Sequence, residues 1–304
     1  MRKISLITLA IILVTLAQTH AQEHIIPLWE TVPNQKESSE KEVQQQNDIL
    51  LVSNVQEPLI EVFLPNGRAQ TGEAVLIFPG GGYHVLAYDW EGRDLAKYLS
   101  SQGIVGIVVK YRLPISKSII NPSIAPLQDA QRAMRIVRSK AKEWHIDENK
   151  IGIMGFSAGG HLASTLGTLY DEKVYEPTDD ADKLSARPDF MALIYPVITM
   201  TDLTHGGSKE ALIGKNPTAE MVKKYSGELN VNAETPSTFI VHSMDDDAVP
   251  VENSLQFLDA LAKNKIYTEA HIYPTGGHGY SMGIGNAQLS SWPGLFVTWV
   301  KTLL

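Results

Sequence analysis

The stretch that decides the fold is residues 150–170, KIGIMGFSAGGHLASTLGTLY, because it places one serine in a Gly-x-Ser-x-Gly turn between two different segments. KIGIMGF is apolar and predicts a buried strand, whereas AGGHLASTLGTLY predicts a helix. A short Gly/Ser run can also be a flexible linker, but a strand before it and a helix after it are typical of a nucleophile elbow. In such an elbow a strained turn holds the serine at the carboxyl edge of a sheet. We therefore interpret Ser157 as a nucleophile, with Gly155 and Gly159 small because a Cβ there would collide with the adjoining strand and helix.

Short runs rich in valine and isoleucine recur along the chain and predict about eight strands. They are ILLVSNV (49–55), LIEVFLP (59–65), AVLIFPGGG (74–82), IVGIVVKY (104–111), KIGIMGF (150–156), FMALIYPV (190–197), TFIVHSM (238–244) and YTEAHIYP (267–274). No helical segment separates the first two, which predicts an antiparallel start. The later strands alternate with amphipathic segments such as residues 92–103 and 251–264. This alternation predicts an α/β fold, with a mostly parallel eight-stranded sheet covered by helices on both faces.

The chain is predicted to contain a leader, an extension and one main domain. Residues 1–21 have a basic start followed by an apolar run of about fourteen residues, which is shorter than the roughly twenty that a membrane-spanning helix needs. We interpret them as a cleaved signal peptide, which predicts export to the periplasm or the medium without stable membrane insertion afterwards. Residues 22–48 are expected to be an N-terminal extension that precedes the core, and its polar part KESSEKEVQQQND (36–48) is expected to be exposed. Residues 49–304 are expected to form the α/β domain, with a small cap insertion at 199–236.

The composition argues against a nucleic-acid partner. The formal net charge is −8 at pH 7, and removing Arg2 and Lys3 with a leader that has no acidic residue makes it −10. Lysine and arginine do not cluster, so a polyanion is not an expected partner. There is no cysteine, and the chain is therefore predicted to fold without disulfides.

A serine nucleophile needs a base, and the base needs a residue that orients it. FIVHSMDDDAVP places Asp245, Asp246 and a third acid directly after a predicted strand, and YPTGGHGYSMG places His278 in a glycine-rich loop after the last strand. Serine, acid and histidine occur in the order that this architecture requires. The three acids leave open which one orients His278. His161 follows Ser157 by one helical turn, and we expect it to shape the floor of the site.

The donors for an oxyanion are predicted in IFPGGGYHV, residues 77–85. Three consecutive glycines let the backbone approach a substrate and aim N–H groups at one point. The N–H of Ala158, the residue after the nucleophile, can join them. A structural hairpin turn is the alternative interpretation.

Taken together, PGGG, YRLP at 111–114, GFSAGGHLA, DDDAVPVENS and GGHGY resemble the α/β-hydrolase superfamily, and within it the esterases similar to hormone-sensitive lipase. IPLW at 26–29, FPGGGY and GFSAGGHLAS are most similar to the acetylxylan esterase branch, which includes bifunctional acetyl and feruloyl carbohydrate esterases. The resemblance covers nearly all of the chain after the leader. It implies the α/β-hydrolase fold.

The resemblance also implies site residues. The family's nucleophile falls on Ser157 and its base on His278. The family's acid stands four residues after the histidine of the VH pair, which selects Asp246 over Asp245.

The oxyanion donors that the resemblance implies are the N–H groups of Gly80, Gly81 and Ala158. Relatives similar to hormone-sensitive lipase carry His-Gly-Gly-Gly, whereas this chain has Pro79 in place of the histidine. A shift of the donors to Gly82 is therefore the alternative.

The function implied is that of a serine carboxylic-ester hydrolase, which removes acetyl or feruloyl groups from xylan or a related plant polysaccharide through an acyl-enzyme, with no metal or organic cofactor. Tyr83, Trp90 and Trp292 are candidates for stacking on sugar rings. One alternative is a serine peptidase of the prolyl-oligopeptidase type, which usually carries a large extra domain. Another is a carbohydrate-binding relative without activity, which would generally lack a member of the triad. The oligomeric state stays open.

Overall fold

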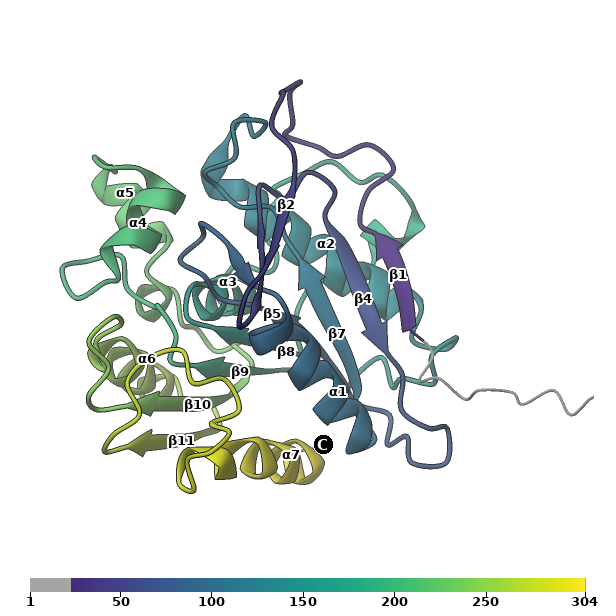
Figure 1. Ribbon diagram of the computed structural model, residues 1–304, viewed down its shortest axis with the longest axis vertical. Helices are drawn as coiled ribbons and strands as arrows, with labels where there is room; N and C mark the ends of the chain where they lie inside the picture. Colours follow the sequence, from purple (N-terminus) through teal and green to yellow (C-terminus); the bar gives the residue numbers. More distant parts are fainter. Residues whose placement is uncertain (1–22, 304) are drawn as a thin grey trace, which may run out of the picture.

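The computed structural model describes residues 23–303, in which an eight-stranded sheet forms the centre of the molecule (Figure 1). In their order across the sheet, the strands are β1 (Glu23–Pro27), β4 (Leu59–Phe63), β7 (Val105–Lys110), β5 (Ala74–Phe78), β8 (Ile151–Phe156), β9 (Phe190–Ile194), β10 (Ser237–Ser243) and β11 (Thr268–Tyr273). β4 is antiparallel to both of its neighbours, and every other neighbouring pair is parallel. The prediction of a mostly parallel eight-stranded sheet is confirmed.

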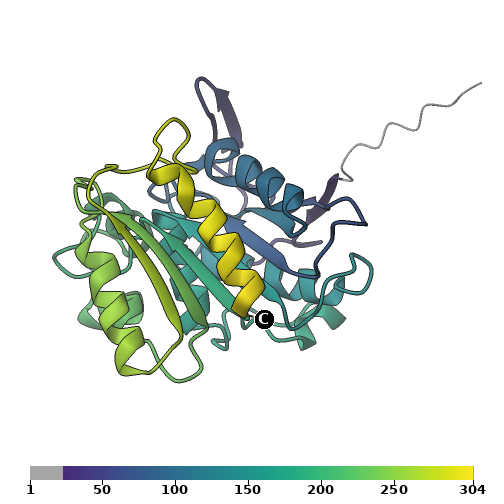
Figure 2. The ribbon, with the colours of Figure 1, turned by 90° about the horizontal axis from the view of Figure 1, so that it is seen from below.

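Helices cover both faces of this sheet. α1 (Asp94–Ser101) and α7 (Trp292–Leu303) lie on one face, and α2 (Ala125–Ser139), α3 (Ala158–Thr168) and α6 (Glu252–Lys263) lie on the other (Figure 2). Because both faces are covered, the central strands β5, β7, β8 and β9 are buried along their whole length. The short helical turns are η1 (Asp89–Arg93), η2 (Pro122–Ile124), η3 (Asp180–Lys183), η4 (Gly227–Leu229) and η5 (Leu289–Ser291).

The first predicted strand does not belong to the main sheet. β3 (Leu50–Ser53) pairs instead with β2 (Val43–Gln46) and β6 (Leu86–Ala87) in a separate antiparallel sheet. The edge position next to β4 is taken by β1, so the antiparallel start exists but uses a different segment. β2 is exposed at every residue, because only its partner β3 carries apolar side chains that reach the core.

The expectation that the core starts after residue 48 is wrong for Leu28 and Trp29, which are only 1% and 6% exposed. Trp29 Nε1 donates a hydrogen bond of 2.8 Å to Asp129 Oδ1. Arg112 binds both oxygens of the same carboxylate, and neither side chain of this ion pair is exposed. The core therefore begins well before residue 49.

Replacement of Asp129 by alanine should destabilise the fold strongly. The variant Asp129→Ala leaves the Arg112 guanidinium buried without its counter-charge, and breaking a buried pair on one side costs about 3–5 kcal/mol. Urea unfolding should show this loss, whereas Asp180→Ala, which removes a fully solvated partner of Lys183, should leave the midpoint unchanged. A free energy of unfolding within about 1 kcal/mol of the wild type in Asp129→Ala would contradict the role of this pair.

The predicted cap insertion, residues 199–236, lies between β9 and β10. It contains α4 (Gly206–Ile213), α5 (Ala219–Lys224) and η4, and the two helices stand apart from the main sheet (Figure 1). The predicted signal peptide, residues 1–21, lies outside the described residues. Between residues 23 and 303, no helix combines the length and the apolar character needed to cross a bilayer.

Candidate active site

Ser157 occupies the turn between β8 and α3, with φ 52° and ψ −118°. A non-glycine residue with positive φ is strained, and here the close approach of three chain segments maintains the strain. A Cβ at Gly155 would lie 2.2 Å from the carbonyl oxygen of Gly159, and one at Gly159 would lie 2.1 Å from that of Phe78. Both positions therefore require glycine, and the turn presents the serine at the carboxyl end of β8.

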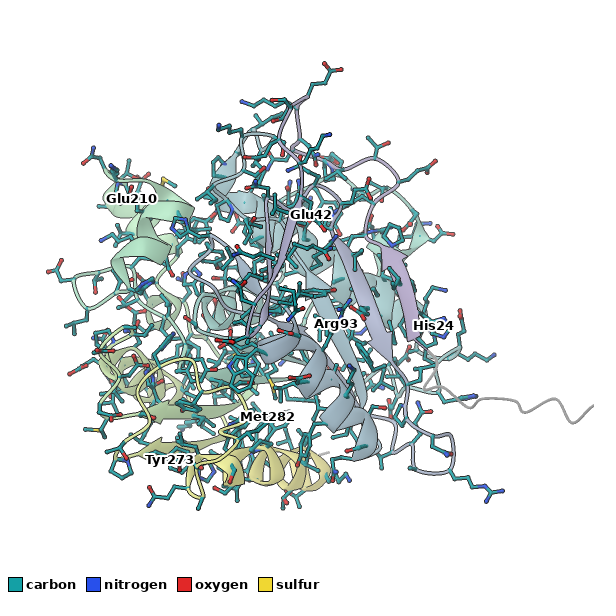
Figure 3. All side chains as sticks on the ribbon, in the orientation of Figure 1. His24, Glu42, Arg93, Glu210, Tyr273 and Met282 are labelled. Atoms are coloured by element: carbon teal, nitrogen blue, oxygen red, sulfur yellow. The ribbon has the colours of Figure 1, made fainter. Side chains whose placement is uncertain are left out.

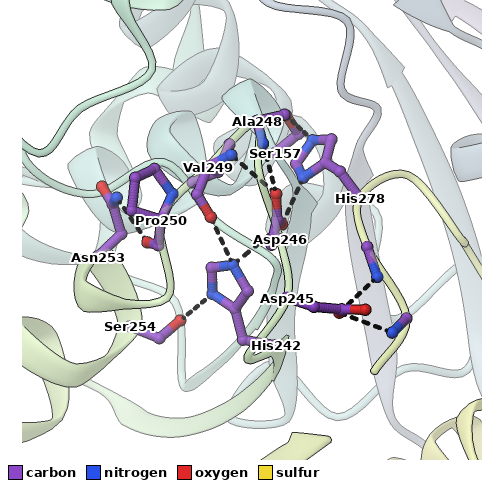
Figure 4. Close-up of polar contacts among 12 residues, drawn as sticks. Ser157, His242, Asp245, Asp246, Ala248, Val249, Pro250, Asn253, Ser254 and His278 are labelled. Carbon is purple, nitrogen blue, oxygen red and sulfur yellow. Dashed lines mark hydrogen bonds and ion pairs between the residues drawn. The ribbon is translucent and has the colours of Figure 1, made fainter. Parts of the chain in front are cut away.

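Ser157, His278 and Asp246 meet at this edge of the sheet (Figure 4). His278 Nε2 lies 2.8 Å from Ser157 Oγ, and His278 Nδ1 lies 2.7 Å from Asp246 Oδ2. Asp246 stands in the loop after β10, and His278 stands in the loop after β11, residues 274–283, which we call the histidine loop. Since parallel strands end at the same edge of the sheet, three side chains far apart in sequence come within hydrogen-bond distance.

Asp246 is held as a carboxylate by four donors. Its Oδ1 accepts the N–H groups of Ala248 (3.0 Å) and Val249 (2.8 Å), and its Oδ2 accepts from His242 Nε2 at 3.1 Å as well as from His278. Burial alone would raise the pKa of Asp246, but the hydrogen bonds from His242, His278 and Val249 hold it well below its usual range. The residue therefore stays ionised at neutral and mildly acidic pH.

The tautomers of both histidines follow from their partners. Because a carboxylate only accepts, His278 carries its proton on Nδ1, which leaves Nε2 free to accept from the Ser157 hydroxyl. His242 Nε2 donates to Asp246 and to the carbonyl oxygen of Val249 (3.0 Å). His242 is fully buried and also orients the acid, a role that was not assigned to it from the sequence; its position four residues before Asp246 is the signal that could have found it.

Asp245, the alternative acid, has a different partner. Its Oδ1 accepts the N–H groups of Gly276 and Gly277, each at 2.8 Å. It thus fastens the histidine loop to the loop after β10, while Asp246 alone of the two aspartates contacts His278 (Figure 4).

The N–H of Gly80 does not serve as an oxyanion donor, which corrects the prediction for this residue. It donates to Glu91 Oε2 at 2.8 Å, so the buried carboxylate already occupies it. Among the described residues, none accepts a hydrogen bond from the N–H of Gly81, Gly82 or Ala158. We call residues 80–82 the oxyanion loop. It lies against the serine, since a Cβ at Gly80 would be 3.0 Å from the Cβ of Ser157.

Comparison with known proteins assigns the family. The family model described as BD-FAE matches residues 60–261, which include the elbow and Asp246. The chain belongs to the BD-FAE family. This membership confirms the resemblance to carbohydrate esterases that the motifs indicated.

Three relatives of the chain are informative. Acetylxylan esterase of Xylanibacter ruminicola is 37% identical over 226 residues, which cover 73% of this chain and 43% of that protein. Endo-1,4-beta-xylanase B of Butyrivibrio fibrisolvens is 37% identical over 222 residues, 73% of this chain and 34% of that protein. The chain thus spans less than half the length of these two relatives. The crystal structure of an acetyl ester-xyloside bifunctional hydrolase from Caldicellulosiruptor lactoaceticus is 36% identical, with a TM-score of 0.78 over 92% of this chain and 96% of that one. The predicted α/β-hydrolase fold is confirmed.

Two of the three aromatic residues that were expected to stack on sugars are buried in the core. Tyr83 is 1% exposed and Trp292 is fully buried, so the prediction is wrong for both. Trp292 Nε1 donates to the carbonyl oxygen of Ser281, and Trp90 Nε1 donates to that of Gly279, each at 2.9 Å. Both indoles therefore brace the histidine loop. Trp90 keeps part of its surface exposed, and its contact with substrate stays a prediction.

His161 fixes Tyr83 beneath the oxyanion loop. Its Nε2 donates to the carbonyl oxygen of Tyr225 (2.7 Å), so its Nδ1 must accept from the Tyr83 hydroxyl (2.8 Å). Burial lowers the pKa of His161 to about 4, which keeps the ring neutral. The expected role of His161 in the floor of the site agrees with this contact.

A cavity of about 480 Å³ lies between His84 in the loop after Gly82, residues 115–123, and the cap helix α4. A side chain at Gly82 would meet both His84 and the cap residue His205 at 3.6 Å. The cavity therefore adjoins the oxyanion loop. Ile115 and Met221 supply apolar walls, and Asn121 and Glu210 supply polar groups.

Between residues 23 and 303 there is no group of three or more histidine, cysteine or acidic side chains placed to hold a metal ion.

Proposed function

We propose that this chain is a serine carboxylic-ester hydrolase that removes acetyl groups from xylan or a related plant polysaccharide. The observation that carries the proposal is the position of His278, whose ring bridges Ser157 Oγ at 2.8 Å and Asp246 Oδ2 at 2.7 Å. This is the geometry that a histidine base needs to activate a serine hydroxyl.

In the proposed reaction, Ser157 Oγ attacks the ester carbonyl while its proton passes to His278 Nε2. The oxyanion of the tetrahedral intermediate accepts hydrogen bonds from Ala158 and from Gly81 or Gly82. His278 then protonates the departing sugar oxygen, which leaves an acetyl group on Ser157. A water molecule that gives its proton to His278 hydrolyses this ester, and the carboxylate of Asp246 stabilises the imidazolium in both steps.

An acetylated polysaccharide is supported as substrate by two observations. The names of two relatives of the chain refer to acetylxylan or acetyl ester-xyloside hydrolysis. The cavity beside Gly82 also offers apolar walls and a few polar groups next to the oxyanion loop, where a bulky leaving group has room. We further propose that residues 1–21 direct export, since a polymeric substrate must be met outside the cytoplasm.

A bulky side chain in this cavity should separate large substrates from small ones. Ile115 lines the cavity and is 42% exposed, so Ile115→Trp should be tolerated and should fill the space. We expect kcat/KM on acetylated xylan fragments to fall about tenfold, with an aryl acetate hydrolysed at the wild-type rate.

Ile25→Trp is the matched control, because Ile25 is 64% exposed on β1 and lies beside His24, across the molecule from Glu210 of the cavity (Figure 3). It should behave as wild type on both substrates. If Ile115→Trp lowers kcat/KM equally on the xylan fragments and on the aryl acetate, the proposal that the polysaccharide lies in this cavity is contradicted.

The function itself is tested by incubating the purified protein with acetylated xylan fragments, short-chain aryl esters and a proline-containing peptide anilide. Mass spectrometry should detect a loss of acetyl groups from the fragments and no cleavage of the anilide. Cleavage of the anilide alone would favour the peptidase alternative. Binding to the fragments without release of acetate would favour an inactive carbohydrate-binding protein.

A further inference from the structure

Glu91 is a buried carboxylate between the two loops of the candidate site, and the proposed reaction does not use it. Only 4% of its surface is exposed. Its Oε2 accepts the N–H of Gly80 at 2.8 Å, and its Oε1 accepts the hydroxyl of Tyr195 at 2.7 Å. One oxygen therefore holds the oxyanion loop, and the other points to a different segment.

The second contact leads to the histidine loop. The Tyr195 oxygen accepts the N–H of Ser281 at 2.8 Å, three residues after His278. The Tyr195 ring also packs edge-on against the His278 imidazole, with 4.9 Å between the ring centroids. Glu91 and Tyr195 thus form a continuous bridge from Gly80 to the residues that place the base.

The backbone is unusual at every residue of this bridge after Gly80. Glu91 lies in η1, a π-helical turn of the kind often found at functional sites. Tyr195 has φ 36° and Ser281 has φ 48°, a region that residues other than glycine enter at an energetic cost. Such strain persists only where the surroundings enforce it, and here the hydrogen bonds of Glu91 and Tyr195 enforce it.

We propose that Glu91 is a positioning residue for the ester-hydrolysing site: its carboxylate fixes the oxyanion loop relative to the histidine loop and directs a second negative charge toward His278. This inference rests on the proposed function. The hydrogen bonds from the Gly80 N–H and the Tyr195 hydroxyl favour the ionised form, because both Glu91 oxygens face donors. The Tyr195 oxygen already accepts from Ser281, so its own proton is directed at Glu91.

The charge of Glu91 acts on the imidazolium that forms during the reaction. The ionisable groups that interact with His278 include Asp246, Glu91, Tyr195 and His205. Burial raises the pKa of Glu91, while the hydrogen bonds from Tyr195 and Gly80 oppose this shift. Removal of this charge therefore raises the energy of the transition state in which the imidazolium forms.

The variant Glu91→Gln keeps the shape of the side chain but replaces one acceptor oxygen by an amide NH₂ group. Only one of the two donors, the Gly80 N–H and the Tyr195 hydroxyl, then finds an acceptor. We expect kcat on an aryl acetate to fall 10- to 100-fold with KM changed less than about threefold, as when catalytic groups are displaced by a fraction of an ångström. A retained wild-type kcat would overturn the proposal, and so would a KM that rises as much as kcat falls.

Two further variants complete the test. Glu73→Gln is the matched control, since Glu73 is also 4% exposed but precedes β5, whereas Gly80 follows that strand; it should retain wild-type kinetics. If circular dichroism shows that Glu91→Gln is unfolded, the variant Tyr195→Phe tests the proposal in its place. It removes the hydroxyl that links Glu91 to Ser281 but keeps the ring against His278. Its kcat should fall with KM unchanged, and a wild-type kcat would overturn the proposal. A wild-type protein that hydrolyses no ester would refute the proposed function instead.

Discussion

Ser157→Ala is expected to lower kcat on an aryl acetate by on the order of 10⁶-fold while leaving the fold intact. The substitution removes only the hydroxyl group, and loss of the nucleophile in a triad abolishes nearly all of the rate above background. The side chain is 7% exposed and makes its polar contact with His278, so the melting temperature should change little. Initial rates and a thermal melt on the same preparation measure both quantities.

Ser164→Ala is the matched control for this variant. Ser164 is a buried serine of α3, the helix that directly follows Ser157. Its hydroxyl donates a hydrogen bond to the carbonyl oxygen of His161. It should retain wild-type activity. Substantial activity in Ser157→Ala would end the assignment of the nucleophile.

The second large effect distinguishes two adjacent acids. Asp246→Asn should lower kcat by about 10⁴-fold, because an amide facing His278 Nδ1 favours the wrong tautomer of the base. Asp245→Asn should cost less than about tenfold, since the amide oxygen can still accept the N–H groups of Gly276 and Gly277. Parallel kinetics of the two variants on one aryl acetate measure the difference. The reverse ranking would show that the acid is misassigned.

The parts of the site that the sequence predicts are those set by local pattern. Ser157 stands between an apolar run and a helical segment, and Asp246 and His278 each follow a predicted strand, so the common edge of a parallel sheet brings them together. The choice between Asp245 and Asp246 depends on loop conformation. The family pattern suggested Asp246, and the hydrogen bond to His278 agrees with it.

The wrong predictions concern groups whose partners lie far away in sequence or in an unusual turn. The N–H of Gly80 donates to the carboxylate of Glu91, which lies in a π-helical turn. The amino-acid composition gives no sign of such a turn. Trp292 carries an indole that could stack on a sugar, but it packs against Phe156 in the core. The edge strand β1 is short and ends at Pro27, and its place in the sheet depends on pairing with β4.

The most direct test of the central claim is covalent labelling with a fluorophosphonate probe, mapped by peptide mass spectrometry. The account predicts one adduct on Ser157, formed quickly in the wild type and at a greatly reduced rate in His278→Ala. Release of acetate by a protein that the probe does not label at Ser157, or labelling that is indifferent to His278, would contradict it.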